Sequence, residues 1–425
     1  MNGQASLRVL VVLPLYGGSL PVGRYAATAL RDLGHTVDVF EAPAFYSAFS
    51  ALRMLRVTSD RQEALEHSFL QVISQAIRAR VEVFEPDLVL CLAQAPVSRQ
   101  LLKTLARDKV TTAMWFVEDY RVFPYWRAVA PLYDFFFVIQ KEPFIKKLAA
   151  AGARAAYLPL AALPSFHRPL GEEELSVAER RHYGSAVSFM GAGYPNRRRA
   201  FRQLSHLDFK IWGSDWNGEV SLAPFLQDGG ARIEPEQAIK IFNASAINLN
   251  LHSSVQAKEL VPAGDFVNPR TFEIACCGAF QLVDRRGLLP ELFREDELAT
   301  FTSMPELLDA IPYYLARPDE RRELAMRGRA RVLAEHTYQH RMAALVEEIR
   351  RCQPDWPTHR PTMTLPADLP EDLRRDLAEL LRQLELPGDV AFEDVVTRLR
   401  QRNGVLNPLE TSLLFLDEWR KQYRK

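Results

Sequence analysis

The segment Asn268–Phe280, with the sequence NPRTFEIACCGAF, carries two charged side chains that could do chemistry. Arg270 and Glu273 are three positions apart, which places them on one face of a helix, close to its start. Free N–H groups at a helix start attract anions, and a nearby arginine adds a bidentate fork for phosphate. A carboxylate there can accept hydrogen bonds from ribose hydroxyls. Spacing alone supports equally well a surface ion pair worth about 0.3 kcal/mol.

The same segment also supplies the boundaries of its helix. Asn268 is a favourable N-cap residue, Pro269 suits the first helical position, and Gly278 is expected just past the end. Cys276 and Cys277 could suggest a metal or redox site. Adjacent cysteines bridge only with strain, however, and no histidine or cysteine follows at ligand spacing. We therefore expect both thiols to pack as small apolar groups.

Length and composition set the class of protein. A chain of 425 residues is long enough for two domains and an appendage. The 48% hydrophobic and 25% charged fractions are typical of a folded chain, and a formal net charge of zero argues against nucleic acid as a partner. Four cysteines without knuckle spacing indicate a reducing, cytoplasmic location. No apolar stretch reaches the roughly 20 residues of a membrane span.

Apolar runs alternate with helix-like segments in two series. Strands are expected at Leu7–Leu13, His35–Phe40, Leu88–Leu92, Thr112–Phe116, Phe135–Val138, Ala156–Leu158, Ala186–Met190, Asp208–Trp212, Ala246–Leu251 and Ala279–Val283. Helices are expected between them and at Met304–Leu315 and Asp319–Glu335. This order predicts an α/β protein with two doubly wound, Rossmann-like domains that face a cleft, where ligands bind at the carboxyl ends of the strands.

Proline clusters mark the domain boundaries. We predict a first domain at 1–160, a linker at 161–184 and a second domain at 185–335. Prolines gather again around 354–366, and the remaining extension, 358–425, has only helical patterns. Its apolar stripes either close a small bundle or bind a partner protein.

Three sequence blocks point to a family. SFMGAGYPNRR, NPRTFEIACCGAFQLVD and HTYQHR occur in this order and resemble the CgeB-like glycosyltransferases, named after a spore maturation protein, most clearly over 187–351. The resemblance implies a GT-B fold, with an N-terminal acceptor domain, a nucleotide-sugar domain and a helix at 336–357 that crosses back. It implies transfer of a sugar, with UDP among the carriers, to a protein, a polysaccharide or a lipid-linked glycan. The donor is a co-substrate and no cofactor is implied.

The resemblance also assigns donor-binding residues after the strands of the second domain. Gly193 lets the backbone approach a phosphate, and Arg197 neutralises the diphosphate, although consecutive arginines also suit a solvated helix start. Asn250 and His252 end a strand that faces the same cleft.

Two acids define the rest of the donor set. Asp265 and Glu273 form Asp-x7-Glu where retaining relatives carry Glu-x7-Glu. Glu273 matches the acid that holds the ribose, whereas Asp265 is shorter by one methylene, which leaves its role near the sugar open. Asn268 and Arg270 complete this set.

On the acceptor side, Gly17 and Gly18 resemble the loop that faces the acceptor cleft. An inverting enzyme needs a base, for which we favour Asp119 over a role as a capping acid. The chain has no Asp-x-Asp triplet, so we expect cationic groups rather than a metal to stabilise the diphosphate. His336 and His340 have zinc-like spacing but no third ligand, and we expect His167, in the linker, to be structural or solvated.

Two other classes of protein fit the same pattern. A nucleotide-sugar epimerase shares the fold and needs no acceptor. A catalytically silent relative would bind nucleotide sugar without turnover.

Overall fold

The computed structural model describes residues 6–255, 260, 264–357, 368–386, 388 and 390–423. The chain forms two compact units, Met1–Cys352 and Gln353–Lys425, which are described separately. The second unit therefore begins ahead of the boundary predicted at 358, because the last helix of the first unit ends at Cys352. The proline-rich stretch predicted at 354–366 lies outside the described residues from position 358 onward.

The N-terminal half of the first unit is built on a parallel sheet with the strand order β2-β1-β3-β4-β5-β6. Its strands are β1 Arg8–Val12, β2 Thr36–Phe40, β3 Leu88–Leu92, β4 Thr111–Phe116, β5 Phe135–Val138 and β6 Ala155–Tyr157. The apolar runs become strands because β1, β3, β4 and β5 are buried along their whole length. The chain reverses direction across the sheet between β1 and β3, so the loops after these strands border a crevice.

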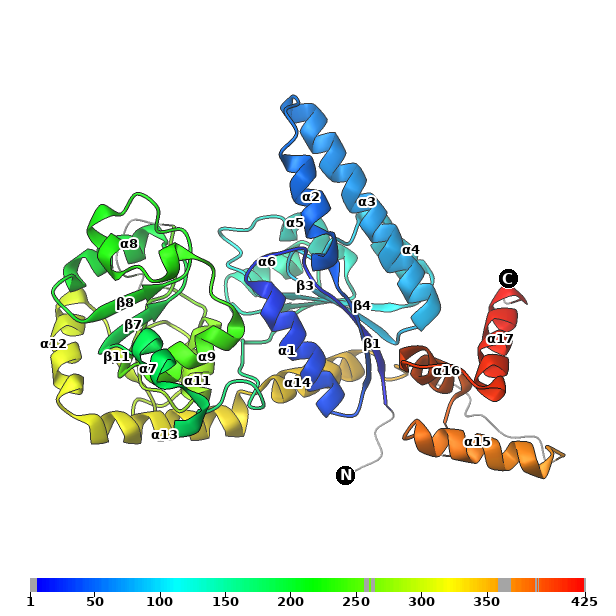
Figure 1. Ribbon diagram of the computed structural model, residues 1–425. Coiled ribbons are helices and arrows are strands. Elements are labelled where there is room, and N and C mark those ends of the chain that lie inside the picture. Colours follow the sequence, from blue (N-terminus) through cyan, green and yellow to red (C-terminus); the bar gives the residue numbers. More distant parts are fainter. Residues whose placement is uncertain are drawn as a thin grey trace. The chain divides into compact units, whose positions relative to one another are not determined.

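Helices connect these strands and cover the sheet (Figure 1). They are α1 Ser19–Asp32, α2 Tyr46–Arg53, α3 Ser59–Phe84, α4 Arg99–Arg107, α5 Trp126–Val129 and α6 Phe144–Ala150. Helix α1 leaves the loop that contains Gly17 and Gly18. The pair α2 and α3 forms a hairpin that stands away from the sheet at the top of Figure 1.

The C-terminal half has a second parallel sheet, in the order β11-β10-β9-β7-β8. Its strands are β7 Val187–Met190, β8 Phe209–Trp212, β9 Ile247–Asn250, β10 Gln281–Asp284 and β11 Ala299–Phe301. Two doubly wound sheets confirm the predicted fold class. Sequence reasoning missed β11, an edge strand too short to give a periodic signal. This sheet reverses between β7 and β9, which sets a second crevice beside the loops that follow them.

The helices of this half are α7 Val177–Tyr183, α8 Pro195–Phe201, α9 Pro235–Ala244, α10 Pro269–Cys276, α11 Leu289–Leu292, α12 Met304–Leu315 and α13 Pro318–Glu335. Helix α14, Tyr338–Cys352, then returns to the N-terminal half and packs against α1. The return is fixed by backbone pairing between Ala162 and Thr337, and by Arg341, whose side chain donates to the carbonyl of Leu160 at 3.2 Å.

The second unit consists of helices α15 Glu371–Gln383, α16 Phe392–Gln401 and α17 Pro408–Tyr423. Leucine and valine side chains of the three helices share one apolar core, which includes Leu381, Val395 and Leu413. This unit therefore has a core of its own.

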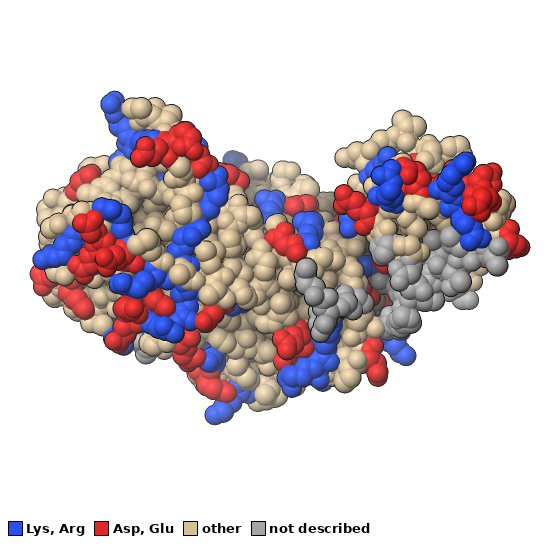
Figure 2. Space-filling view, turned by 90° about the horizontal axis from the view of Figure 1, so that it is seen from below, with Lys and Arg blue, Asp and Glu red and all other residues tan. Residues whose placement is uncertain are grey.

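The face of the molecule seen in Figure 2 carries charges of both signs. On the face shown in Figure 2, Lys and Arg side chains are interleaved with Asp and Glu. None of the described helices is both long and apolar enough to cross a bilayer.

Candidate functional site

The predicted donor residues converge at the carboxyl ends of β7 and β9 and at the start of α10. Arg197, on α8, donates from Nε to the carbonyl of Leu251, one residue beyond β9. Asn268, which precedes α10, donates to Asn250 at the end of β9. Residues from three separate segments, namely α8, the end of β9 and the start of α10, therefore meet at the crevice of the second sheet.

Arg197 is a buried cation. It is 9% exposed, and its guanidinium donates to the carbonyls of Leu251 at 2.9 Å and Ala192 at 3.0 Å. Burial lowers its pKa to about 10. Within the described part of the chain it makes no ion pair with a carboxylate. The Asp284 carboxylate opposes the fall in its pKa, and the nearby Arg270 and Arg286 add positive charge. A buried cation without a paired carboxylate favours an anion at this point.

Gly193 has a structural role in addition to the predicted approach to a phosphate. A Cβ at this position would lie 2.3 Å from the carbonyl oxygen of Asp215, so only glycine allows the loop after β7 to pack on the loop after β8. The carbonyl of Gly193 also accepts a hydrogen bond from Arg198 at 2.6 Å. Gly193 therefore shapes the loop that carries Arg197 into the site.

The start of α10 is held by a network of buried amides. Asn268 is the N-cap, as predicted, because its Oδ1 accepts from the N–H of Thr271 at 3.1 Å. Its Nδ2 donates to Oδ1 of Asn250 at 2.7 Å. Asn250 in turn donates to Thr271 Oγ1 at 2.9 Å and to Gln281 Oε1 at 3.0 Å. Asn250 thus uses its side chain to fix the helix start.

His252 is a second support for the same helix. Its Nε2 accepts from the N–H of Asn268 at 2.9 Å, so the proton lies on Nδ1, which is 2.6 Å from Oδ1 of Asp284. Burial lowers the pKa of His252, which keeps the imidazole neutral. Both ring nitrogens are used inside the protein. Asp284 was missed because the predicted strand ended one residue before it.

Arg270 and Glu273 form the i, i+3 ion pair that the spacing allowed, but it is not a surface pair. Glu273 is only 3% exposed, so the surface ion pair that the spacing also allowed is not what forms. His167 is buried beside it, with Nε2 3.8 Å from Glu273 Oε1. Because His167 Nδ1 accepts from the N–H of Leu163 at 3.0 Å, its Nε2 carries the proton that faces Glu273. His167 is therefore structural rather than solvated.

Asp265 and Asp119 come together from opposite halves of the first unit. Arg121, in the loop after β4, donates to Asp265 at 3.3 and 3.1 Å. Gln140, just beyond β5, donates from Nε2 to Asp265 at 2.7 Å and to Asp119 at 3.2 Å. Asp119 also accepts from the N–H of Arg121 at 3.0 Å. Sequence reasoning missed Arg121 and Gln140, which follow strands at the same sheet edge as Asp119.

The acceptor-side loop contacts the other half of the unit as well. Gly17 has φ of +107°, a conformation that favours glycine, and its carbonyl accepts from Arg232 at 3.0 Å. Gly18 follows and precedes α1. Close to this loop, Glu118 accepts hydrogen bonds from Gln94 and, at 2.9 Å, from the hydroxyl of Tyr125. Burial raises the pKa of Glu118.

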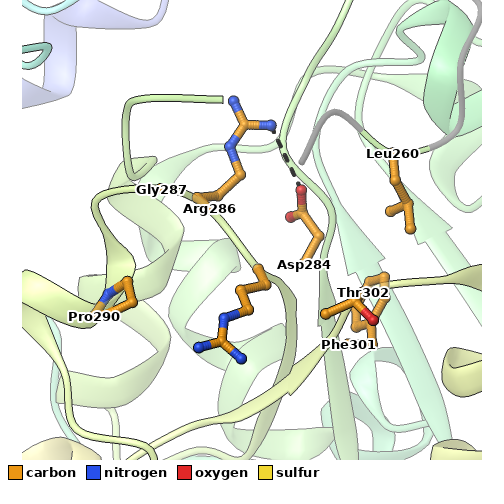
Figure 3. A pocket seen from close by; sticks show the side chains of 8 residues that line it. Leu260, Asp284, Arg286, Gly287, Pro290, Phe301 and Thr302 are labelled. Atoms are coloured by element: carbon orange, nitrogen blue, oxygen red, sulfur yellow. Dashed lines mark ion pairs between the residues drawn. The ribbon is translucent and has the colours of Figure 1, made fainter. Parts of the chain in front are cut away.

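A hollow of about 250 Å³ lies beside β10 and β11 (Figure 3). Leu260, Gly287 and Thr302 are among the residues that line it. Arg286 and Asp284 form an ion pair of 3.6 Å at its edge, as Figure 3 shows. Since Asp284 also holds His252, this ion pair links the hollow to the support beneath α10.

His336 and His340, the two histidines with zinc-like spacing, form hydrogen bonds with different partners. His336 Nε2 donates to the carbonyl of Leu292 at 2.7 Å, and its Nδ1 accepts from Arg341 at 2.8 Å. His340 Nδ1 contacts the hydroxyl of Thr337 at 2.7 Å. Among the residues described, no three His, Cys, Asp or Glu side chains are grouped to hold a metal ion.

Comparison with known proteins gives a consistent result. Residues 197–347 match a family described as glycosyl transferase-like. The chain is 24% identical over 257 residues to spore protein CgeB of Bacillus subtilis (strain 168), which covers 58% of this chain and 77% of CgeB.

Two solved structures illustrate the likeness in fold. Sucrose-phosphate synthase from Thermosynechococcus elongatus has a TM-score of 0.56 at 13% identity, covering 82% of this chain and 100% of its own. Anabaena HepE in complex with UDP and glucose has a TM-score of 0.56 at 11% identity, covering 81% and 100%. At such identities these structures show the fold alone, which is that of GT-B proteins.

Proposed function

We propose a donor and a reaction for this chain, which is a CgeB-like glycosyltransferase with a GT-B fold. The donor is a nucleotide-diphosphate hexose, and the reaction transfers the hexose to a hydroxyl of an acceptor. The observation that carries the proposal is Arg197, a buried cation without a carboxylate partner in the described chain, at the crevice where α10 begins. UDP is the first nucleotide to test, because HepE was solved with UDP and glucose.

In this reaction, negative charge develops on the leaving diphosphate, and fixed cations or N–H groups must stabilise it. Arg197 and Arg270 supply the cations, and the backbone N–H of Arg270, which the Asn268 cap does not use, supplies a further donor at the start of α10. These groups are in place before the donor binds, because Asn250, Asn268 and His252 hold the helix start. The proposed reaction is therefore metal-independent.

The remaining predicted residues take roles around the sugar. When the donor binds, the Arg270 side chain turns from Glu273 toward the diphosphate. The Glu273 carboxylate then accepts hydrogen bonds from the ribose hydroxyls. Asp265 lies beside the sugar. Its hydrogen bonds with Arg121 and Gln140 hold the two halves of the first unit together. Asp119 accepts the proton of the acceptor hydroxyl. Gly17 and Gly18 leave room for the acceptor.

A thermal-shift panel of UDP, GDP, dTDP and CMP, each with and without its sugar, tests the donor. A ligand at a hundred times its dissociation constant stabilises the folded state by about 2.7 kcal/mol, which is readily seen as a rise in melting temperature. Hydrolysis of the stabilising donor is then measured with and without a chelator. Absence of any shift argues against the donor site, and loss of turnover with chelator argues against the metal-independent reaction. Release of an altered sugar nucleotide without acceptor would instead identify an epimerase.

A further inference from the structure

The carboxylate of Glu273 is enclosed by side chains from three other segments. His167 comes from the stretch between β6 and α7, Tyr25 from α1 and Tyr338 from α14. All three are buried, and the hydroxyl of Tyr338 forms no hydrogen bond with the described part of the chain. Burial, and then the charge of Glu273, raises the pKa of both tyrosines, so both lie within electrostatic range of this carboxylate. Glu273 therefore lies where the two halves of the first unit meet.

The two oxygens of Glu273 have different neighbours. Oε2 is paired with Arg270, whose side chain is 35% exposed. Oε1 faces Nε2 of His167 at 3.8 Å, and this histidine side chain is buried. A ligand in the crevice therefore reaches Glu273 from the side of Arg270, and Oε2 is the oxygen that it meets.

His167 presents a fixed hydrogen-bond donor to the other oxygen. Its Nδ1 accepts from the N–H of Leu163 at 3.0 Å, so the proton of the neutral ring is on Nε2. Burial lowers the pKa of His167, which keeps the ring neutral at pH 7. The ring packs edge-on against Tyr25 and Phe166, with centroids 4.9 and 5.1 Å away, so its orientation is set by packing.

This donor matters once the donor substrate is bound. The contact of 3.8 Å is longer than a hydrogen bond while Arg270 holds the opposite oxygen. When Arg270 turns toward the diphosphate, Glu273 loses its cation, and a buried carboxylate without partners is costly. The Nε2–H of His167 is then within a short movement of Oε1. A hydrogen bond there would hold the carboxylate with Oε2 toward the opening.

We propose that His167 is the positioning residue for ribose recognition. Its Nε2–H holds Oε1 of Glu273, so that Oε2, once Arg270 has turned away, accepts hydrogen bonds from the ribose hydroxyls. The inference rests on the proposed function and deepens it, because it assigns the two oxygens of Glu273 to different partners. It also gives a residue outside the family blocks a part in choosing the nucleotide.

The experiment compares UDP with dideoxy-UDP, which lacks both ribose hydroxyls, by titration calorimetry on the full chain. The unaltered protein is expected to prefer UDP by at least about tenfold, because hydrogen bonds to a carboxylate are lost with the hydroxyls. In His167→Asn, the amide reaches the position of Nδ1 and keeps an acceptor for Leu163, but no donor reaches Glu273. This variant should prefer UDP by about threefold or less.

His167→Gln is the matched control. Its amide reaches the position of Nε2, so it keeps a donor toward Glu273 and gives up the acceptor for Leu163. Both variants lose one contact of the ring and should lower the melting temperature, yet His167→Gln should retain the preference for UDP. A purely structural role of His167 would instead reduce the preference equally in both variants, or in neither, and either result overturns the proposal.

A measurement on the unaltered protein makes the test independent of the stability of the variants. In NMR spectra of protein with isotope-labelled histidine, the Nε2–H signal of His167 should move when UDP binds and move less when dideoxy-UDP binds. Equal affinity of the unaltered protein for the two nucleotides overturns the role of His167 and leaves the diphosphate site standing. If neither UDP nor GDP binds, the donor site itself is contradicted, and this inference with it.

Discussion

Arg121 and Asp265 form a two-pronged hydrogen-bonded ion pair between the N-terminal and C-terminal halves of the first unit, with N–O distances of 3.3 and 3.1 Å. Asp265 is the first acid of the Asp-x7-Glu pair, so a residue assigned to the sugar also contacts the opposite domain. Gln140 reinforces the contact from β5 by bonding both Asp265 and Asp119. Asp265 therefore joins the two halves of the first unit through Arg121 and Gln140.

Variants at the two ends of this ion pair separate its two roles. Arg121→Ala removes only the contact between halves, whereas Asp265→Ala also removes the proposed contact with the sugar. We expect both to change the free energy of unfolding by about 1 kcal/mol or less, because the arginine is exposed. Steady-state hydrolysis of the donor should show a kcat/KM at least about tenfold lower for Asp265→Ala than for Arg121→Ala. Equal losses would leave Asp265 with the contact between halves as its sole role.

Arg197 tests the diphosphate site most directly. In Arg197→Met, the cation disappears while a side chain of similar length fills the pocket. The variant loses two hydrogen bonds to carbonyls, each worth about 1 kcal/mol, and is relieved of the cost of a buried charge. We therefore expect its melting temperature to stay close to that of the unaltered protein, while titration calorimetry shows nucleotide-diphosphate affinity at least about tenfold lower. Unchanged affinity would remove Arg197 from the donor site.

Glu273 and Cys276, on the same helix, should respond in opposite ways. Because Glu273 is buried against Arg270, alanine would leave both a cavity and an unpaired cation, so glutamine is the cleaner change. Glu273→Gln should weaken binding of the nucleotide sugar more than it lowers stability. Cys276→Ala should lower the free energy of unfolding by about 1 kcal/mol and leave affinity unchanged. Calorimetry and chemical denaturation of both variants test this, and a loss of affinity in Cys276→Ala would contradict it.

The fold could be predicted from sequence because long apolar runs and helix boundaries are local signals. The N-cap Asn268 and the helix Met304–Leu315 were found in this way. Which polar side chains of the site are buried, by contrast, depends on partners that are distant in sequence. His252 and Asn250 follow a strand toward the crevice, but the polar atoms of Asp284 and Thr271, distant in sequence, already satisfy them.

The contacts between the two halves of the first unit could not be predicted from the sequence for the same reason. Arg121 and Gln140 carry no motif, and their partner Asp265 is more than a hundred positions away. The resemblance to a family identified residues of the donor side, where the blocks are dense.

Two neighbouring acids compete for the role of base. Asp119 lies at the contact with Asp265, whereas burial raises the pKa of Glu118, which Gln94 and Tyr125 hold in place. A general base contributes about 100-fold or more to the rate. We expect Asp119→Asn to lower donor hydrolysis by at least that factor and Glu118→Gln to have a smaller effect. A larger loss in Glu118→Gln would transfer the role to Glu118.

His336 should make the protein less stable in mild acid. Its Nδ1 accepts a hydrogen bond from Arg341, so a proton there would face a guanidinium. Burial is the main cause that lowers its pKa from 6.5 to about 4. Between these values the unfolded chain binds a proton that the folded protein does not. Stability is therefore constant above pH 6.5 and falls as the pH drops toward 4, by about 3 kcal/mol from His336 alone.

Burial also lowers the pKa values of His167 and His252, which add to the fall in the same direction. Urea denaturation of His336→Gln at several pH values isolates one contribution. The variant should be less stable at pH 7, because glutamine replaces a ring packed between Phe272 and Phe293, yet lose less stability on acidification. His206→Gln is the matched control, since His206 is exposed and should leave the pH dependence intact. If His336→Gln retains the full dependence on pH, the proton is taken up elsewhere.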